Sequence, residues 1–129
     1  MRKIMVVDDS GVMLRNAKAL LEDDYEIQLA VSGKMALNLL SVKKPDLIFL
    51  DYEMPEMDGM ETYRNIKTLA NCADIPVIFL TGEEDETTIN NILSEKPAGY
   101  IIKPPTKEKL VNMINNCLGS VEGSDYAAV

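Results

Sequence analysis

Hydrophobic and polar positions divide the chain into five short apolar segments separated by longer amphipathic ones. The apolar segments are Lys3–Val7, Ile27–Val31, Leu47–Leu50, Ile75–Leu80 and Tyr100–Ile102. Three of them are continuously apolar and rich in Ile, Val, Leu and Phe, which is typical of strands buried on both faces of a parallel sheet. The second segment alternates in part, because Gln28 interrupts it, and this favours a strand at the edge of the sheet.

Between these segments, apolar residues recur at helical spacing and follow residues that commonly cap helices. Helices are expected to begin at Ser10, at Ser32 or Gly33, at Asp58, near Glu84 and near Thr106. The first of them is expected to turn one apolar face inward, formed by Val12, Met13, Ala17, Leu20 and Leu21. Pro45 and Pro97 end the second and fourth helical regions, and Gly119 is expected to cap the last helix.

The alternation of strands and helices predicts an α/β fold. Strands joined by right-handed helical crossovers form a doubly wound sandwich, and a five-stranded parallel sheet with five helices fits the flavodoxin-like strand order 2-1-3-4-5. We expect residues 1–118 to form one domain. Residues 119–129 are rich in Gly and Ser and lack periodicity, so we expect either a flexible tail or the start of a linker to an output domain.

Composition removes several classes of function. The chain has 129 residues, 13 basic and 21 acidic side chains, a net charge of −8 and no histidine. Binding to DNA or RNA needs a dense set of Lys and Arg, so direct nucleic-acid binding is not expected. The lack of histidine excludes His-dependent triads and ordinary His-ligated zinc. No segment suits a signal peptide or a membrane span, and Cys72 and Cys117 match no metal or redox spacing, so we expect a cytoplasmic protein with reduced thiols.

Polar side chains follow four of the five predicted strands. They are Asp8 and Asp9 after the first, Asp51 after the third, Thr81 after the fourth and Lys103 after the fifth. The carboxyl ends of parallel strands meet at one edge of the sheet, where open α/β sheets bind ligands. Clustered carboxylates suit Mg²⁺ or Mn²⁺, and a carboxylate can act as the nucleophile that forms an aspartyl phosphate. A hydroxyl and an ammonium group can then stabilise the phosphoryl group.

These residues and their surroundings resemble the receiver domain of two-component response regulators. The matching motifs are Asp8-Asp9-Ser10, residues 51–59 (DYEMPEMDG), Leu80-Thr81-Gly82 and Tyr100-Ile101-Ile102-Lys103-Pro104. The resemblance covers Arg2 to about Leu118 and implies that residues 1–118 are a receiver domain.

The resemblance implies a role for each residue that contacts the phosphoryl group. Asp51 would be the phosphoacceptor, and Thr81 and Lys103 would contact the phosphoryl oxygens. Tyr100 would turn inward when Thr81 moves, which would change the surface formed by the fourth helix, the fifth strand and the fifth helix. The Lys103–Pro104 peptide bond would be cis.

The resemblance also implies a metal site. Asp9 would hold Mg²⁺ directly and Asp8 through water, together with Asp51 and the backbone carbonyl of Glu53. The side chains of Glu53 and Glu83 would border the path of the water that hydrolyses the acyl phosphate, so the lifetime of the phosphorylated form is left open.

By the same resemblance, the phosphoryl donor would be a phosphohistidine on a sensor histidine kinase or a histidine phosphotransfer protein. The signal would pass to a downstream protein or to a covalently linked output domain, and no membrane partner is expected. The chain would assist its own phosphorylation and dephosphorylation without being a turnover enzyme.

The residues alone also allow three other hypotheses. A Mg²⁺-dependent phosphohydrolase would likewise use Asp51 as nucleophile, but it would carry Asp and Thr where Glu53 and Met54 stand. A flavodoxin-like cofactor binder would need a phosphate-binding loop where Asp8 and Asp9 stand. A phosphorylation-independent interaction module would have no use for the intact set of site residues.

Overall fold

The computed structural model describes residues 1–119, which form a five-stranded parallel sheet with five helices. The strands are β1 (Lys3–Val7), β2 (Glu26–Ala30), β3 (Leu47–Asp51), β4 (Val77–Thr81) and β5 (Gly99–Ile102). The helices are α1 (Gly11–Leu21), α2 (Gly33–Leu40), α3 (Gly59–Thr68), α4 (Glu86–Ser94) and α5 (Lys107–Leu118). The order β2-β1-β3-β4-β5 confirms the predicted flavodoxin-like sandwich. The tail or linker expected at 119–129 lies, beyond Gly119, outside the described residues.

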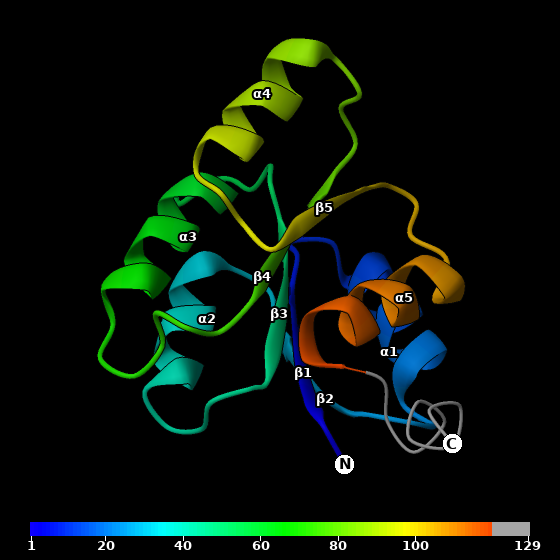
Figure 1. Cartoon of the computed structure of the whole chain (residues 1–129). Coiled ribbons are helices and arrows are strands. Elements are labelled where there is room, and N and C mark those ends of the chain that lie inside the picture. Colours follow the sequence, from blue (N-terminus) through cyan, green and yellow to red (C-terminus); the bar gives the residue numbers. More distant parts are fainter. Residues whose placement is uncertain (120–129) are drawn as a thin grey trace.

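Helices cover both faces of the sheet (Figure 1). Helices α1 and α5 pack on one face, and α2, α3 and α4 pack on the other. Alternate residues of the central strands supply the two cores: Phe49 and Ile78 face α1 and α5, whereas Ile48 and Phe79 face the opposite layer. Because both faces of β1, β3 and β4 are buried, these strands are continuously apolar in sequence. Within residues 1–119, no helix has the length and apolarity needed to cross a bilayer.

Each helix begins where a side chain accepts a hydrogen bond from a backbone amide three residues further on. The capping residues are Ser10, Ser32, Asp58, Asp85 and Thr106. Four of these five caps coincide with predicted helix starts. The exception is α4, which begins at Glu86 rather than near Glu84, because Asp85 occupies the cap position and accepts from Thr88 N.

The inward face of α1 differs from the prediction at two positions, Val12 and Leu14. Val12 is 58% exposed, whereas Leu14 is buried together with Ala17 and Leu21. The spacing from Leu14 to Ala17 to Leu21 follows one stripe of the helix, and Val12 lies off that stripe. Residues 12–14 are all apolar, so the pattern alone does not decide which of them faces the core.

Helix α4 is the helix with the fewest buried residues. Its one buried side chain is Ile92, and Leu93 is 49% exposed. Its C-terminal end is tied to α3, because Tyr63 Oη donates to the Glu95 carbonyl oxygen at 3.0 Å and Arg64 Nε lies 3.1 Å from Glu95 Oε1. Helix α4 is therefore anchored chiefly at the end remote from the carboxyl edge of the sheet.

Candidate functional site

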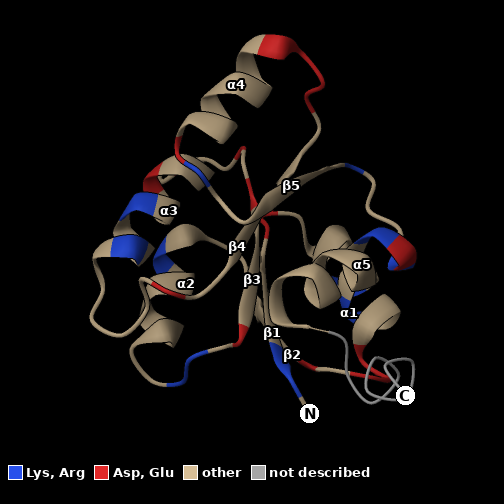
Figure 2. Ribbon diagram, in the orientation of Figure 1, with Lys and Arg blue, Asp and Glu red and all other residues tan. Residues whose placement is uncertain are grey.

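The strand register brings the polar strand ends to one edge of the sheet. Three register pairs set the arrangement: Val7–Leu50, Asp51–Leu80 and Thr81–Ile102. The side chains placed at this edge are those of Asp8, Asp51, Thr81 and Lys103. Figure 2 shows acidic residues, in red, at these central strand ends and in the segment that leads into α4.

Three carboxylates converge at this edge. Oxygens of Asp8, Asp9 and Asp51 all lie within 4.8 Å of one another. Asp8 and Asp51 are buried, whereas Asp9 is exposed. The amide of Ser10 donates to Asp8 Oδ1 at 2.9 Å, and the amide of Glu53 donates to Asp51 Oδ1 at 3.2 Å. The structure therefore brings together the three predicted side-chain ligands of the metal site.

The amides of Ser10 and Glu53 are absent from the predicted site, although each orients one of its carboxylates. The signal is present in the sequence, because an Asp at the end of a strand often accepts a hydrogen bond from the amide two residues further on. Such a turn holds the carboxylate in place and supplies part of the hydrogen bonding that burial demands.

Lys103 bridges the two buried carboxylates. Its Nζ lies 2.9 Å from Asp51 Oδ1 and 3.0 Å from Asp8 Oδ2. Asp51 Oδ1 thus accepts from both Lys103 and the Glu53 amide, while Asp51 Oδ2 accepts no hydrogen bond from residues 1–119. The Lys103–Pro104 peptide bond is cis, the isomer that the resemblance implies.

Burial governs the protonation of this cluster. Desolvation raises the pKa of Asp51 to about 7. The hydrogen bond from Lys103 lowers this pKa, whereas the negative charge of Asp8 raises it further. Desolvation also disfavours the Lys103 ammonium, but its hydrogen bonds to Asp51 and Asp8 outweigh that cost and raise the pKa of Lys103. One ammonium group cannot compensate three carboxylates, so the cluster favours an additional cation.

The donor set fits Mg²⁺. Three carboxylates within 4.8 Å of one another supply hard oxygen ligands, and the exposure of Asp9 leaves room for coordinated water. A hard divalent ion that keeps several waters matches a site of this kind better than a soft metal does. The carbonyl of Glu53, a further predicted ligand, belongs to the loop that directly follows Asp51.

The remaining predicted residues lie on neighbouring elements rather than in the carboxylate cluster. Thr81 is fully buried, and its hydroxyl accepts from the Glu83 amide at 3.0 Å. Tyr100 is half-buried on β5, where it pairs in register with Phe79 and packs against the core on the α3 side. The side chains of Glu53 and Glu83 are exposed, beside the edge where the carboxylates meet.

Comparison with known proteins identifies the family. The family model described as the response regulator receiver domain matches residues 4–115. The chain belongs to this family. The receiver domain is 32% identical over 117 residues to the two-component response regulator ORR3 of Oryza sativa subsp. indica, with 89% of each chain covered. The resemblance stated from the sequence is thereby confirmed.

Solved structures share the fold of this receiver domain. The chemotaxis protein CheY4 of Vibrio cholerae superposes with a TM-score of 0.85 at 27% identity, covering 92% of this chain and 99% of that chain. A response regulator receiver domain protein from Clostridium thermocellum superposes with a TM-score of 0.82 at 30% identity, covering all of both chains. Receiver domains accept a phosphoryl group on an aspartate in two-component signal transduction, so the chain is a signalling receiver.

Several curated relatives are considerably longer than this chain. The transcriptional regulatory protein CrdR of Helicobacter pylori is 34% identical over 104 residues, which are 80% of this chain and 48% of that protein. The chain spans about half or less of the length of the first five curated relatives that it matches. In those proteins the matched region is therefore one part of a larger protein.

Proposed function

We propose that Asp51 accepts the phosphoryl group in this receiver domain. The observation that carries the proposal is the convergence of three carboxylates and one ammonium group at the carboxyl edge of the sheet. Asp8 is buried and pairs with Lys103 as Asp51 does, but both of its oxygens accept hydrogen bonds, whereas Asp51 Oδ2 accepts none from residues 1–119 and is available for attack.

Asp8, Asp9 and Asp51, with the backbone carbonyl of Glu53, are the groups that would hold Mg²⁺, and Mn²⁺ would use the same oxygen ligands. When bound, the ion neutralises negative charge on the phosphoryl oxygens. The buried carboxylates of Asp8 and Asp51 are already oriented by the Ser10 and Glu53 amides, so little reorganisation is needed.

In the transfer step, a carboxylate oxygen of Asp51 attacks the phosphorus of a phosphohistidine. An oxygen–phosphorus bond forms, the nitrogen–phosphorus bond breaks, and the donor imidazole leaves with the electron pair and takes up a proton from water. We assign the attack to Oδ2, because Oδ1 accepts from Lys103 and from the Glu53 amide. An ionised carboxylate is itself the nucleophile, so the step needs no general base.

Lys103 and Thr81 would stabilise the product. The ammonium of Lys103 lies beside Asp51 and can pair with a phosphoryl oxygen. The Thr81 hydroxyl accepts from the Glu83 amide, so its own hydrogen is available for a phosphoryl oxygen. A shift of Thr81 toward the phosphoryl group would alter the segment that leads into α4 and let Tyr100 turn inward, which would change the surface of α4, β5 and α5.

We further infer that residues 1–118 are the receiver unit and that it acts as a phosphoacceptor switch rather than as a turnover enzyme. Glu53, which stands where a phosphohydrolase of this chemistry carries its second acid, is exposed. The donor would be a sensor histidine kinase or a histidine phosphotransfer protein. The signal would pass to a downstream protein or to a linked output domain, in keeping with the greater length of relatives such as CrdR.

Intact-mass measurement after incubation with Mg²⁺ and acetyl phosphate tests the assignment of Asp51. We expect the wild type to gain one phosphoryl group, and we expect no gain without Mg²⁺ or in Asp51→Asn. Asp23→Asn is the matched control, because Asp23 is exposed and follows the C-terminal end of α1, whereas the carboxylate cluster lies at its N-terminal end. This control should be phosphorylated like the wild type.

Two results would contradict the proposal. Phosphorylation of Asp51→Asn at the wild-type level would place the acceptor elsewhere. If the wild type gains no phosphoryl group, formation of a Mg²⁺-dependent beryllofluoride complex would indicate a short-lived acyl phosphate. Absence of that complex as well would favour the phosphorylation-independent interaction module.

A further inference from the structure

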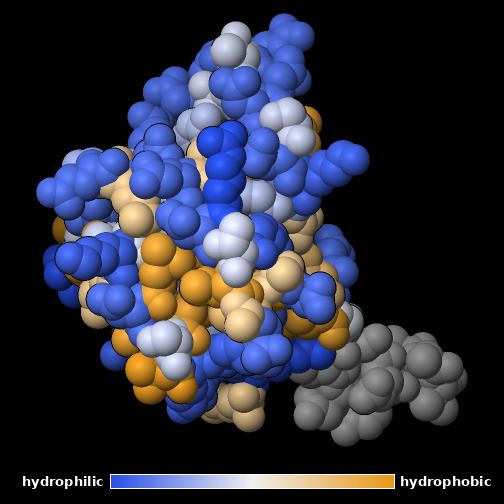
Figure 3. All heavy atoms as spheres, turned by 90° about the vertical axis from the view of Figure 1, so that its left-hand side faces the viewer, coloured by the Kyte–Doolittle hydropathy of each residue, from blue (hydrophilic) through white to orange (hydrophobic). Residues whose placement is uncertain are grey.

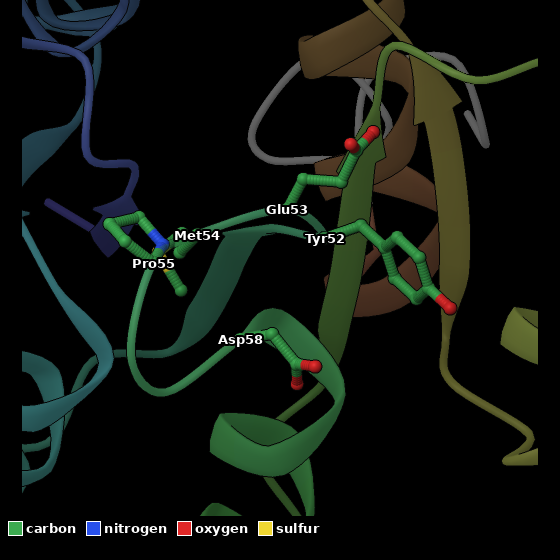
Figure 4. A pocket seen from close by; sticks show the side chains of 5 residues that line it. All are labelled: Tyr52, Glu53, Met54, Pro55 and Asp58. Carbon is green, nitrogen blue, oxygen red and sulfur yellow. The ribbon is translucent and has the colours of Figure 1, made fainter.

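A groove lies between the β3–α3 loop, the start of α3 and helix α4. Two cavities form it, of about 410 Å³ under the β3–α3 loop and about 400 Å³ between α3 and α4. Tyr52 and Asp58 line both cavities, which makes them neighbours along one depression, here called the α3–α4 groove. Figure 4 shows the loop cavity, with Tyr52 and Pro55 on opposite sides of the loop. None of the carboxylates assigned to the metal site lines either cavity.

The Tyr52 ring is a rigid wall of the groove. Its backbone is held at both ends, because its amide donates to the Leu80 carbonyl at 2.8 Å and its carbonyl accepts from the Gly59 amide at 3.0 Å. Its ring makes a T-shaped contact with Phe79, at a centroid separation of 5.8 Å and an interplanar angle of 80°. Phe79 is fully buried, so Tyr52 rests on the core while the half-buried ring lines the groove.

Two exposed carboxylates at the start of α3, those of Asp58 and Glu61, line the same cavity as this ring. Asp58 Oδ1 accepts from the Glu61 amide at 2.8 Å, which leaves its second oxygen and both Glu61 oxygens without a hydrogen bond from residues 1–119. The cation in the groove wall is Arg64, and its charge is already paired with Glu95 at 3.1 Å. The pairing with Glu95 raises the pKa of the Arg64 guanidinium and the nearby Asp58 raises it further, so part of the Asp58 charge is compensated. The carboxylates of Asp58, Glu61 and Glu95 still outnumber this one cation, and an aromatic ring lines the same cavity as the excess negative charge.

We propose that the α3–α4 groove binds an arginine side chain carried by a basic segment of a partner protein. A guanidinium group is planar, so it can stack on Tyr52 while its N–H groups pair with Asp58 and Glu61. The amide side chain of Asn91, on the α4 wall, offers a further acceptor. A lysine can make the ion pair but stacks less well and presents no planar fork.

The charge of the surrounding surface favours the same partner. The segment before α4 carries Glu83, Glu84 and Asp85, and the whole chain has a net charge of −8. Figure 2 shows this acidic segment in red at the start of α4, with basic residues in blue on α3, and Figure 3 shows that the upper part of this side of the molecule is hydrophilic. A basic segment is therefore attracted to the groove over several ångströms before it makes contact.

Titration of the isotopically labelled full chain with two short peptides tests this proposal. The probe is acetyl-Gly-Arg-Arg-Gly-amide and its comparison is acetyl-Gly-Lys-Lys-Gly-amide, followed by amide NMR shifts in saturating Mg²⁺ and without a phosphoryl donor. The metal competes for Asp8, Asp9 and Asp51, and the result does not depend on phosphorylation of Asp51. We expect saturable shifts at Tyr52, Asp58 and Asn91, and tighter binding of the arginine peptide.

Two substitutions with a matched control locate the binding site. Tyr52→Leu and Glu61→Gln should each weaken binding of the arginine peptide by about two- to fivefold, as expected for an exposed cation–π contact and an exposed ion pair. Glu108→Gln removes the same charge from the first turn of α5 and should leave binding unchanged. Glu61 is exposed, so its substitution tests the proposal even if Tyr52→Leu unfolds the domain.

Three outcomes would overturn the proposal. Shifts confined to Asp8, Asp9 and Asp51 would mean that the peptide only competes for the metal site. Equal weakening by Glu61→Gln and Glu108→Gln would mean that binding reflects net charge alone. Equal affinity for the arginine and lysine peptides would show that the Tyr52 ring does not stack on the guanidinium group.

Discussion

Lys103 Nζ lies 2.9 Å from Asp51 Oδ1 and 3.0 Å from Asp8 Oδ2, so one ammonium group just after β5 joins the carboxylate that follows β1 to the one that ends β3. Both carboxylates are buried, and no other cation among residues 1–119 forms an ion pair with them. The side chain assigned to stabilise the phosphoryl group therefore also stabilises the cluster before any phosphoryl group arrives.

Lys103→Met should destabilise the metal-free domain more than the Mg²⁺-bound one. The substitution keeps most of the aliphatic stem but leaves two buried carboxylates without their cation, and we expect a loss of about 2 kcal/mol because Lys103 is only partly buried. Added Mg²⁺ supplies the missing positive charge and should reduce the loss. Urea unfolding with EDTA and with saturating Mg²⁺ measures both quantities.

Lys107→Met is the control for that experiment. Lys107 lies 4.0 Å from Asp24 and both side chains are exposed, so this pair should contribute less than about 0.5 kcal/mol under either condition. Equal destabilisation of Lys103→Met with and without Mg²⁺ would show that Lys103 acts through packing rather than through charge.

The raised pKa of Asp51 makes the stability of the metal-free domain depend on pH. The folded-state pKa is about 7 and the ordinary value is 3.8, so between these values the folded state holds a proton that the unfolded chain has released. This stabilisation is complete below pH 3.8 and is lost as the pH rises through 7. The substituted side chain in Asp51→Asn cannot ionise, so this variant escapes the loss. As the pH rises from 4 to 8, its free energy of unfolding should increase by roughly 2 to 4 kcal/mol relative to that of the wild type.

Urea unfolding of the wild type and Asp51→Asn in EDTA, at a series of pH values, measures this difference. All other titrating groups are common to the two proteins, so the difference between the two curves reports on Asp51 together with its effect on the neighbouring Lys103 and Asp8. With saturating Mg²⁺ the difference should shrink, because the ion favours the ionised carboxylate. Parallel curves in EDTA would show that Asp51 titrates at its ordinary pKa.

Much of the site follows from local sequence. Strands β1, β3 and β4 are buried on both faces, so they are continuous apolar runs with clear ends, and the residues at those ends are the site residues. Parallel pairing then places Asp8, Asp51 and Thr81 at one edge without further information. Helix caps such as Ser10 and Thr106 are equally local, because one side chain satisfies an amide three residues away.

Features that depend on how helices pack do not follow from local sequence. Val12 and Leu14 are both apolar, and only the position of α1 on the sheet decides which is buried. The bridge from Lys103 to two carboxylates depends on the path of the chain after β5. The α3–α4 groove depends on the spacing between two helices, which no periodicity encodes.

Thr81→Ala should separate phosphorylation from its structural effect. The Thr81 hydroxyl accepts from the Glu83 amide at 3.0 Å and is the proposed link between the phosphoryl group and the segment before α4. The nucleophile is the carboxylate of Asp51, and it does not depend on the Thr81 hydroxyl. The variant should therefore still gain one phosphoryl group, as measured by intact mass. The change in the NMR signals of Tyr100 on addition of beryllofluoride and Mg²⁺ should fall by more than half. Thr81→Ser keeps the hydroxyl and should retain the response, whereas a full Tyr100 response in Thr81→Ala would exclude Thr81 as the link.

Tyr63→Phe should loosen the C-terminal end of α4 without disturbing the core. Tyr63 Oη donates to the Glu95 carbonyl at 3.0 Å, and burial, with Glu95 nearby, raises the pKa of Tyr63, so the hydroxyl stays a donor at ordinary pH. The ring contact with Phe79, at a centroid separation of 5.3 Å, is kept in the variant. Losing this hydrogen bond, together with the longer contact of 3.5 Å to the Lys96 carbonyl, should cost about 1 kcal/mol.

Hydrogen exchange measures where that loss falls. Because α4 has a single buried side chain, we expect faster exchange in residues 92–96 than the global loss of stability explains. Tyr25→Phe is the control, since Tyr25 is also buried but its hydroxyl makes no hydrogen bond within residues 1–119. This control should leave exchange in α4 unchanged. A uniform increase across the sheet and α4 in Tyr63→Phe would show that α4 unfolds only together with the whole domain, and that the Tyr63 hydroxyl is not a local anchor.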